Sequence, residues 1–152
     1  MRIAIGSDHN GFTIKNSILI PWLQSQGHQV VDSGAFEFNA EDDYPDFAKK
    51  VALKISTQQA ERGIIICGSG VGASITANKI NGIRAAICHD TYSAKQGVQH
   101  DDMNVICIGS KIVGEQIIYD IIESFLSAQF QDSEERFVRR LNKVLDIEQQ
   151  KL

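Results

Sequence analysis

Residues 63–72 read GIIICGSGVG, and this stretch indicates the fold of the 152-residue chain more clearly than any other. The apolar run before Cys67 is typical of a buried strand. The alternating glycines that follow predict a turn whose backbone N–H groups can closely approach an anion. Residues 73–79 can then begin a helix, whose N-terminus favours negative charge. A thiol placed at the end of such a strand is a candidate for chemistry.

Four further apolar runs alternate with segments of helical spacing. The runs cover residues 3–7, 29–32, 83–88 and 105–108, and the helical stripes cover residues 14–23, 47–55 and 117–125. This alternation predicts an α/β fold with a parallel sheet. We expect one domain over residues 1–152, a three-layer Rossmann-like structure with five parallel strands in the order 2-1-3-4-5 and a C-terminal helix. The acidic run 41–43 is interpreted as a solvated loop before a helix that begins near Pro45.

Composition and charge argue against several classes of function. The chain carries 15 Lys and Arg against 19 Asp and Glu, so it lacks the basic field that nucleic-acid binding needs. The first apolar run is too short for a signal peptide, and no run approaches the roughly 18 apolar residues of a membrane span. We therefore expect a cytoplasmic protein that binds neither nucleic acid nor membrane. Three cysteines without a C-x-x-C pair predict free thiols.

Two of the predicted strands end in residues that can carry chemistry. Asp8 and His9 follow the first strand, and Cys67 with its glycine turn follows the third. In the predicted strand order these two ends are neighbours at the topological switch point, where open α/β sheets bind ligands. An acid, an imidazole, a thiol and several backbone amides would then converge, which is more than a structural turn requires.

Each candidate also has a structural interpretation. Asp8 is a common N-cap residue and can simply cap the first helix. His100 lies in a polar segment before the fifth strand and can be a solvated loop residue. Arg136 and Arg140 stand four apart on the predicted last helix, where they either form a solvated face or clamp one phosphate. Two other thiols are expected to be small buried hydrophobes: Cys88 and Cys107.

Several other phosphate- or nucleotide-binding designs do not fit the sequence. A Cys-dependent phosphatase needs an Arg where Ala73 stands, and a receiver domain needs an Asp where Cys67 stands. A dinucleotide fingerprint needs the spacing G-x-G-x-x-G after the first strand. No ligand spacing supports a metal site drawn from the group of Asp8, His9, Cys67 and His100.

A set of short segments, spread over nearly the whole chain, is specific when taken together. They are GSDH at 6–9, DYP at 43–45, CGSGVG at 67–72, ANK at 77–79, GIRA at 82–85, YSA at 92–94, His100 with NV at 104–105, and GS at 109–110. In these segments the chain resembles the sugar-phosphate isomerases of the ribose-5-phosphate isomerase B type, a family that includes galactose-6-phosphate isomerase subunits.

The resemblance implies interconversion of an aldose phosphate and a ketose phosphate, with no metal or organic cofactor. It implies that Cys67 is the base that moves a proton between C2 and C1. It also implies that His100 opens the furanose ring, with Ser69 as a hydrogen-bond partner. Amides of the glycine turn would hold the oxygens of a cis-enediolate, whose charge develops mainly in the transition state. The turn residues expected to contact substrate are Gly68, Gly70, Val71 and Gly72.

The same resemblance implies further contacts and a shared site. The remaining expected contacts are Asp8 at a hydroxyl, Tyr44 in the pocket, Asp101 in a place that usually holds Asn, and His9, Arg136 and Arg140 at the phosphate. The family is dimeric or tetrameric, so we expect a homodimer or homotetramer in which His100 and the arginines reach Cys67 from a neighbouring chain. The expected substrate is ribose 5-phosphate. The alternatives are a six-carbon substrate, allose 6-phosphate or galactose 6-phosphate, and a non-catalytic phosphosugar sensor.

Overall fold

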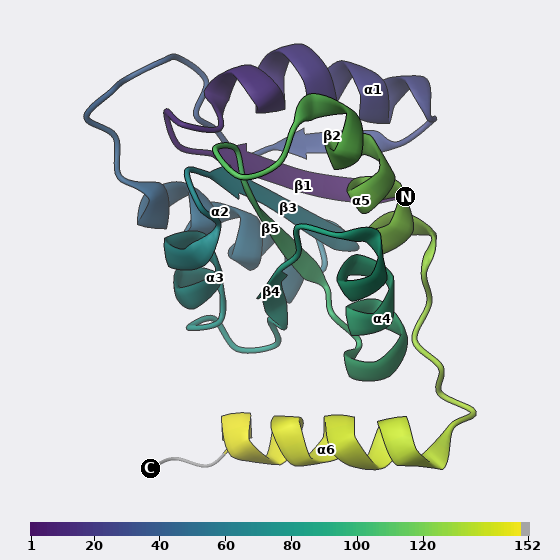
Figure 1. The fold of residues 1–152 in the computed structure, drawn as a ribbon. Coiled ribbons are helices and arrows are strands. Elements are labelled where there is room, and N and C mark those ends of the chain that lie inside the picture. The colour runs from purple at the N-terminus through teal and green to yellow at the C-terminus, as the bar shows by residue number, and fades with distance from the viewer. Residues whose placement is uncertain (150–152) are drawn as a thin grey trace.

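The computed structural model describes residues 1–149 and shows a parallel sheet of five strands with helices on both faces (Figure 1). The strands are β1 (Arg2–Ser7), β2 (Gln29–Asp32), β3 (Arg62–Cys67), β4 (Ala85–Ile87) and β5 (Val105–Gly109). The helices are the π-helical η1 (Ile14–Leu19), α1 (Ile20–Ser25), α2 (Tyr44–Ser56), α3 (Val71–Ala77), α4 (Thr91–Asp101), α5 (Glu115–Ser127) and α6 (Glu135–Gln149). The predicted α/β class is confirmed.

The order of the last two strands differs from the prediction. The sheet runs β2-β1-β3-β5-β4, so β5 rather than β4 pairs with β3. Every residue of β5 is buried, which suits a strand with neighbours on both sides and helices on both faces. Only Ala85–Ile87 of the predicted 83–88 run forms a strand, and its residues are partly exposed, as in a short edge strand. The switch point between β1 and β3 is unaffected.

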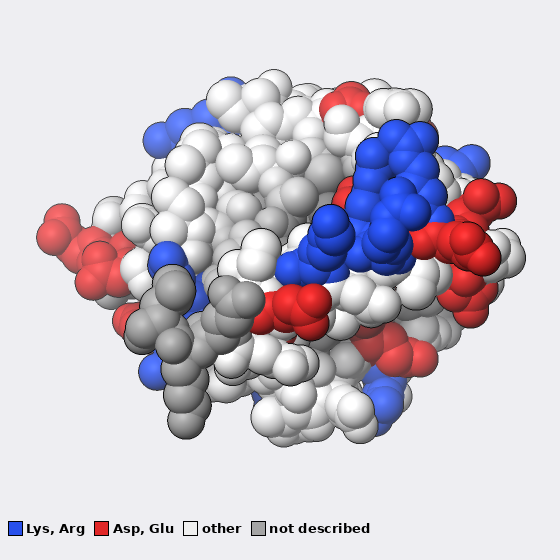
Figure 2. Space-filling view, turned by 90° about the horizontal axis from the view of Figure 1, so that it is seen from below, with Lys and Arg blue, Asp and Glu red and all other residues white. Residues whose placement is uncertain are grey.

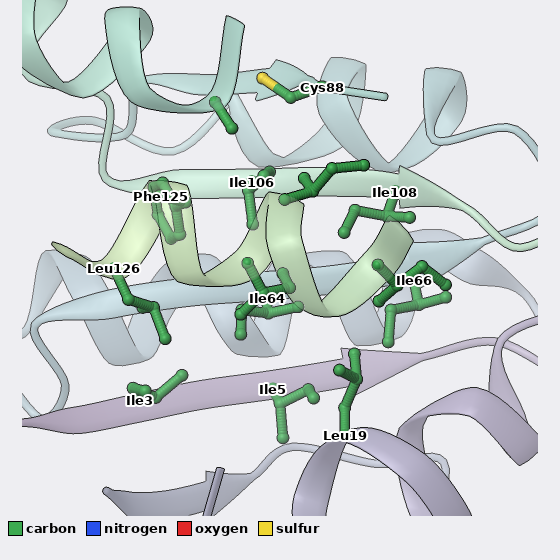
Figure 3. Close-up of a cluster of buried hydrophobic side chains, with 14 of the residues drawn as sticks. Ile3, Ile5, Leu19, Ile64, Ile66, Cys88, Ile106, Ile108, Phe125 and Leu126 are labelled. Atoms are coloured by element: carbon green, nitrogen blue, oxygen red, sulfur yellow. The ribbon is translucent and has the colours of Figure 1, made fainter. Parts of the chain in front are cut away.

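Two hydrophobic cores hold the helices to the sheet. On one face, η1, α1, α4 and α5 pack against Ile3, Ile64 and Ile106 (Figure 3). On the other face, α2 and α3 cover Ala4 and Ile65. As predicted, the thiols of Cys88 and Cys107 are buried, Cys88 in the first of these cores and Cys107 in the second. Burial raises the pKa of the Cys88 thiol to about 11 and also raises the pKa of Cys107, so both stay protonated at neutral pH.

Helix α6 lies apart from the sheet (Figure 1). It contacts α4, and near its far end the backbone N–H of Gly82 donates to the Glu148 carboxylate at 2.6 Å. None of the α6 side chains is buried, and the apolar Val144 and Ile147 are exposed. Within residues 1–149, no helix combines the length and the apolar character that crossing a membrane requires.

Candidate active site

The glycine turn after β3 contacts the sulfur of Cys67. Cys67 is 4% exposed, and the backbone N–H of Gly70 donates to its Sγ at 3.1 Å. Gly70 has a φ of 84°, in the left-handed region, which a side chain would disfavour. In this conformation the N–H of Gly70, the residue before α3, points back toward Cys67 at the end of β3. The sulfur of Cys67 thus has a backbone hydrogen-bond donor at the carboxyl end of β3.

Strand β5 supports the same turn from the other side. Gly109 is paired with Cys67 in the sheet, and a Cβ at Gly109 would lie 2.9 Å from the Cα of Ser69. The missing side chain therefore allows the turn to rest directly on β5. The Gly109 N–H donates to Nε2 of His89 at 3.0 Å, a support that the sequence reasoning did not identify.

Replacing Gly109 with alanine should displace the glycine turn. The added methyl group overlaps backbone atoms of Ser69, so the turn has to move by several tenths of an ångström. We expect kcat to fall by about 10 to 100-fold, because small misplacements of reacting groups have effects of this size. Steady-state kinetics measure the loss, and circular dichroism checks that the fold is retained. Unchanged kcat would contradict this role of Gly109.

The turn after β1 packs beside the end of β3, as predicted. The Asp8 carboxylate accepts hydrogen bonds from the backbone N–H groups of Asn10 (2.9 Å) and Gly11 (3.2 Å), and Asp8 is 5% exposed. A Cβ at Gly11 would lie 2.6 Å from the carbonyl oxygen of Ile66. Asp8 therefore folds the turn that presents the next residue, His9, and does not cap the first helix, whose N-cap position is Thr13.

His9 is held in place by Asp42, which belongs to the acidic run 41–43 that we interpreted from the sequence as a solvated loop. Asp42 Oδ1 lies 2.7 Å from His9 Nδ1 and accepts the His9 backbone N–H at 3.0 Å. His9 Nε2 lies 2.9 Å from Nδ2 of Asn10, whose side chain also lies beside Gly68. The interpretation of residues 41–43 as solvated is therefore wrong for Asp42, whose side chain is only 9% exposed.

Tyr44 also reaches the glycine turn. It begins α2, and a Cβ at Gly72 would lie 2.5 Å from the Cζ atom of its ring. One copy of the chain thus brings together, at the carboxyl edge of β1 and β3, the predicted site residues Cys67, Ser69, Asp8, His9, Tyr44, Gly68, Gly70, Val71 and Gly72.

The other predicted residues lie elsewhere. His100 is in the last turn of α4, which leads into the amino end of β5, and not in a loop. Cys67 lies at the opposite end of the neighbouring β3. Four residue steps of strand separate two such ends by about 13 Å. His100 Nδ1 lies 2.9 Å from Gln96 Nε2, and its ring stacks on Phe137 of α6 with centroids 3.9 Å apart.

Three more residues that were predicted to contact the substrate lie on α4 and α6, near His100 and away from Cys67. Asp101 ends α4 and lines a depression that it shares with Val144 of α6. Arg136 and Arg140 lie exposed on α6. Lys and Arg side chains gather over this helix in Figure 2, where its basic residues are Arg136, Arg139, Arg140 and Lys143.

Comparison with known proteins identifies the class. The family model described as Ribose/Galactose Isomerase matches residues 3–144. Ribose-5-phosphate isomerase B of Escherichia coli (strain K12) is 40% identical over 99% of this chain and 98% of its own length. Galactose-6-phosphate isomerase subunit LacB of Clostridium acetobutylicum is 41% identical over 89% of this chain and 77% of its own.

A solved structure agrees in fold. Ribose-5-phosphate isomerase B from Mycoplasma genitalium, with bound ribulose-5-phosphate, is 39% identical, covers 98% of this chain and 97% of its own, and has a TM-score of 0.91. By its relatives and its fold, the chain is a sugar-phosphate isomerase. It belongs to the Ribose/Galactose Isomerase family.

Proposed function

We propose that this enzyme interconverts ribose 5-phosphate and ribulose 5-phosphate, with Cys67 as the base. The observation that carries the proposal is the hydrogen bond from the Gly70 N–H to the Cys67 Sγ, within a turn of backbone amides. This contact supports a cysteine base that lies beside backbone amides able to act as oxyanion donors. The name of the Escherichia coli relative and the ligand bound to the Mycoplasma relative support the five-carbon substrate.

The reaction needs a base for a weakly acidic carbon and donors for the oxygen charge that follows. The Cys67 thiolate takes the proton from C2 of the open-chain aldose, a C1–C2 double bond forms, and charge moves onto the former carbonyl oxygen. The hydroxyl proton at C2 passes to the oxygen at C1 as the C2 carbonyl forms, and the thiol returns its proton to C1. Amides of the turn Gly68, Gly70, Val71 and Gly72 hold the cis-enediolate oxygens, where fixed donors lower the barrier. For this the Gly70 and Val71 N–H groups exchange their present acceptors, Cys67 Sγ and Ser69 Oγ, for substrate oxygens.

The remaining residues at this edge shape the pocket. The Asp8 carboxylate lies in the turn that follows β1, and the Tyr44 ring packs against Gly72. Ser69 Oγ accepts the Val71 N–H at 3.3 Å, which leaves its hydroxyl proton free to assist ring opening. In the proposal Asp8 contacts a substrate hydroxyl, Tyr44 closes one side, and His9 contacts the phosphate.

Ring opening requires a second copy of the chain. His100 lies in a shallow depression of about 240 Å³ on α4, at the far end of the sheet from Cys67 of the same chain. Exposed apolar side chains flank the glycine turn, which is typical of a surface that another protein covers. They are Val71, Ile75, Ile87 and Ile112. We therefore propose a homodimer or homotetramer in which His100 of one chain faces Cys67 of another.

The basic residues of α6 fit the same arrangement. Arg136 and Arg140 are one helical turn apart and exposed, so both guanidinium groups can contact one phosphate. Helix α6 packs against α4, and the His100 ring stacks on Phe137, so the arginines and His100 form one unit. That unit, together with Asp101, would enter the site of the neighbouring chain.

One observation favours a second candidate substrate. The LacB relative is named for galactose 6-phosphate and is as similar to this chain as the ribose-5-phosphate isomerase B relative. A deeper pocket would admit the additional carbon. A six-carbon phosphate, such as allose 6-phosphate or galactose 6-phosphate, is therefore the alternative.

Formation of ribulose 5-phosphate from ribose 5-phosphate by the purified protein tests the proposal. Allose 6-phosphate and galactose 6-phosphate are supplied in parallel, and kcat/KM is compared among the three sugars. We expect ribose 5-phosphate to exceed both by at least about tenfold, because an extra carbon in a fitted pocket has effects of this size. A higher kcat/KM on a six-carbon sugar would transfer the assignment to it. Ligand-induced stabilisation without turnover on any sugar would indicate a sensor.

A further inference from the structure

Only one of the two oxygens of the Asp42 carboxylate has hydrogen-bond partners among the described residues. Its Oδ1 is bonded to Nδ1 of His9 and also accepts the His9 backbone N–H. Its Oδ2 is buried and has no hydrogen-bond partner within the part of the chain that the structure describes. A buried carboxylate with one unpartnered oxygen is poorly satisfied, and a positive charge formed beside it would stabilise it. Among residues 1–149, the one titratable side chain bonded to it is His9.

The hydrogen bonds around His9 are mutually consistent in one tautomer. An ionised Asp42 can only accept, so His9 Nδ1 carries the proton. The Asn10 amide group has two donors, and its Nδ2 lies 3.4 Å from Asp8 Oδ2 and 2.9 Å from His9 Nε2. The Nε2 atom is then an acceptor. This assignment follows from the network and describes the neutral, ligand-free ring.

A phosphate changes this arrangement because it offers only acceptors. For His9 to bind it, Nε2 has to take up a proton from solvent, and the Asn10 amide has to turn its donor away. The ring is then an imidazolium whose Nδ1–H still donates to Asp42. The other charged group of the network is Asp8, one amide away, and the adjoining glycine turn, Gly68–Gly72, contributes no charged side chain. Exposed Glu41 and Asp43 flank Asp42 in the chain.

We propose that Asp42 is a positioning residue that fixes the tautomer of His9 and balances the imidazolium formed when His9 binds the substrate phosphate. The inference rests on the proposed function only in placing a phosphate at His9. Asp42 does not touch the substrate. It acts through the direction in which it holds the ring and through its negative charge.

The experiment compares Asp42→Asn with the matched control Glu41→Gln. Both variants remove one negative charge from the same loop, but only the first removes it from His9. The amide oxygen of the new side chain can still accept the Nδ1–H, so the variant keeps the shape of the site. Nitrogen-15 NMR of the full-length protein follows the His9 ring, assigned with His9→Gln. The probes are sulfate, which remains a dianion throughout the neutral range, and ribose 5-phosphate.

In the wild type and in Glu41→Gln we expect a neutral Nδ1–H ring without ligand and a doubly protonated ring with sulfate. In Asp42→Asn the sulfate-bound ring should remain largely neutral. The Kd for sulfate and the KM for ribose 5-phosphate should rise by about tenfold, the size expected for losing one charge-assisted contact. The kcat should stay within about twofold, since the base is unaffected.

Sulfate binding that protonates His9 equally in both variants would overturn the proposal, as would a ring that stays neutral in the wild type. If Asp42→Asn does not fold, Asp42→Ser takes its place, and a wild-type ring that stays neutral with sulfate still overturns the proposal. The two proposals can fail separately. An enzyme inactive on all three sugars whose His9 is protonated by sulfate would contradict the proposed function alone, whereas an active enzyme whose His9 stays neutral would contradict only the inference.

Discussion

Replacing Cys67 with alanine should lower kcat for ribose 5-phosphate by roughly 10² to 10⁴-fold, the usual contribution of a general base. The methyl group cannot accept the C2 proton. The amides of the glycine turn remain in place, so ligand binding should change by less than about threefold. Steady-state assays of ribulose 5-phosphate formation measure the loss of kcat. The shift of the melting temperature on adding ribose 5-phosphate measures the change in ligand binding.

Cys88→Ala is the matched control for this experiment. It removes another buried thiol, on the opposite face of the sheet, where the side chain has a raised pKa and packs in the core. We expect its turnover to remain close to that of the wild type. Cys67→Ser should resemble Cys67→Ala, because a hydroxyl is a much weaker acid than a thiol. Turnover of Cys67→Ala comparable to the wild type would rule out the cysteine base.

The fold could be predicted from the sequence except for one exchange of strands. Apolar runs mark the five strands, and the glycine turn marks the ligand edge. The order of β4 and β5 depends on which run is buried on both faces, and both runs are apolar in sequence. The decisive difference is length: β4 spans only Ala85–Ile87, whereas all five residues of β5 are buried and pair with β3, and three of them also pair with β4.

The candidate site was less predictable where it depends on contacts between distant segments. Asp42 is one of three consecutive acidic residues, and nothing in that run indicates which one faces His9, 33 positions away. Asn10 likewise reads as an ordinary turn residue. For His100 a local signal exists, because Gln96 stands four positions earlier, at helical spacing, and the two side chains do meet. The spacing of Gln96 and His100 predicts a helix, whereas the polar composition of the same segment indicates a loop.

The position of His100 has the largest testable consequence for how the enzyme works. Within one chain, α4 places His100 at the amino edge of the sheet and β3 places Cys67 at the carboxyl edge. If each site combines Cys67 of one chain with His100 of another, Cys67→Ala and His100→Ala should each be inactive on ring-closed ribose 5-phosphate. Mixing and refolding the two inactive variants together should then restore turnover.

The size of the recovery follows from counting sites. With random 1:1 pairing into symmetric dimers, half of the dimers are mixed, and each mixed dimer has one site with both residues intact. Turnover should therefore reach about a quarter of the wild-type value per chain. Mixing Cys67→Ala with the double variant Cys67→Ala/His100→Ala is the control, because no site then contains Cys67. Recovery in the first mixture but not in the second requires the two residues to come from different chains. No recovery, from mixtures shown by mass spectrometry to contain mixed dimers, would mean that each chain has to bring its own His100 to its own Cys67.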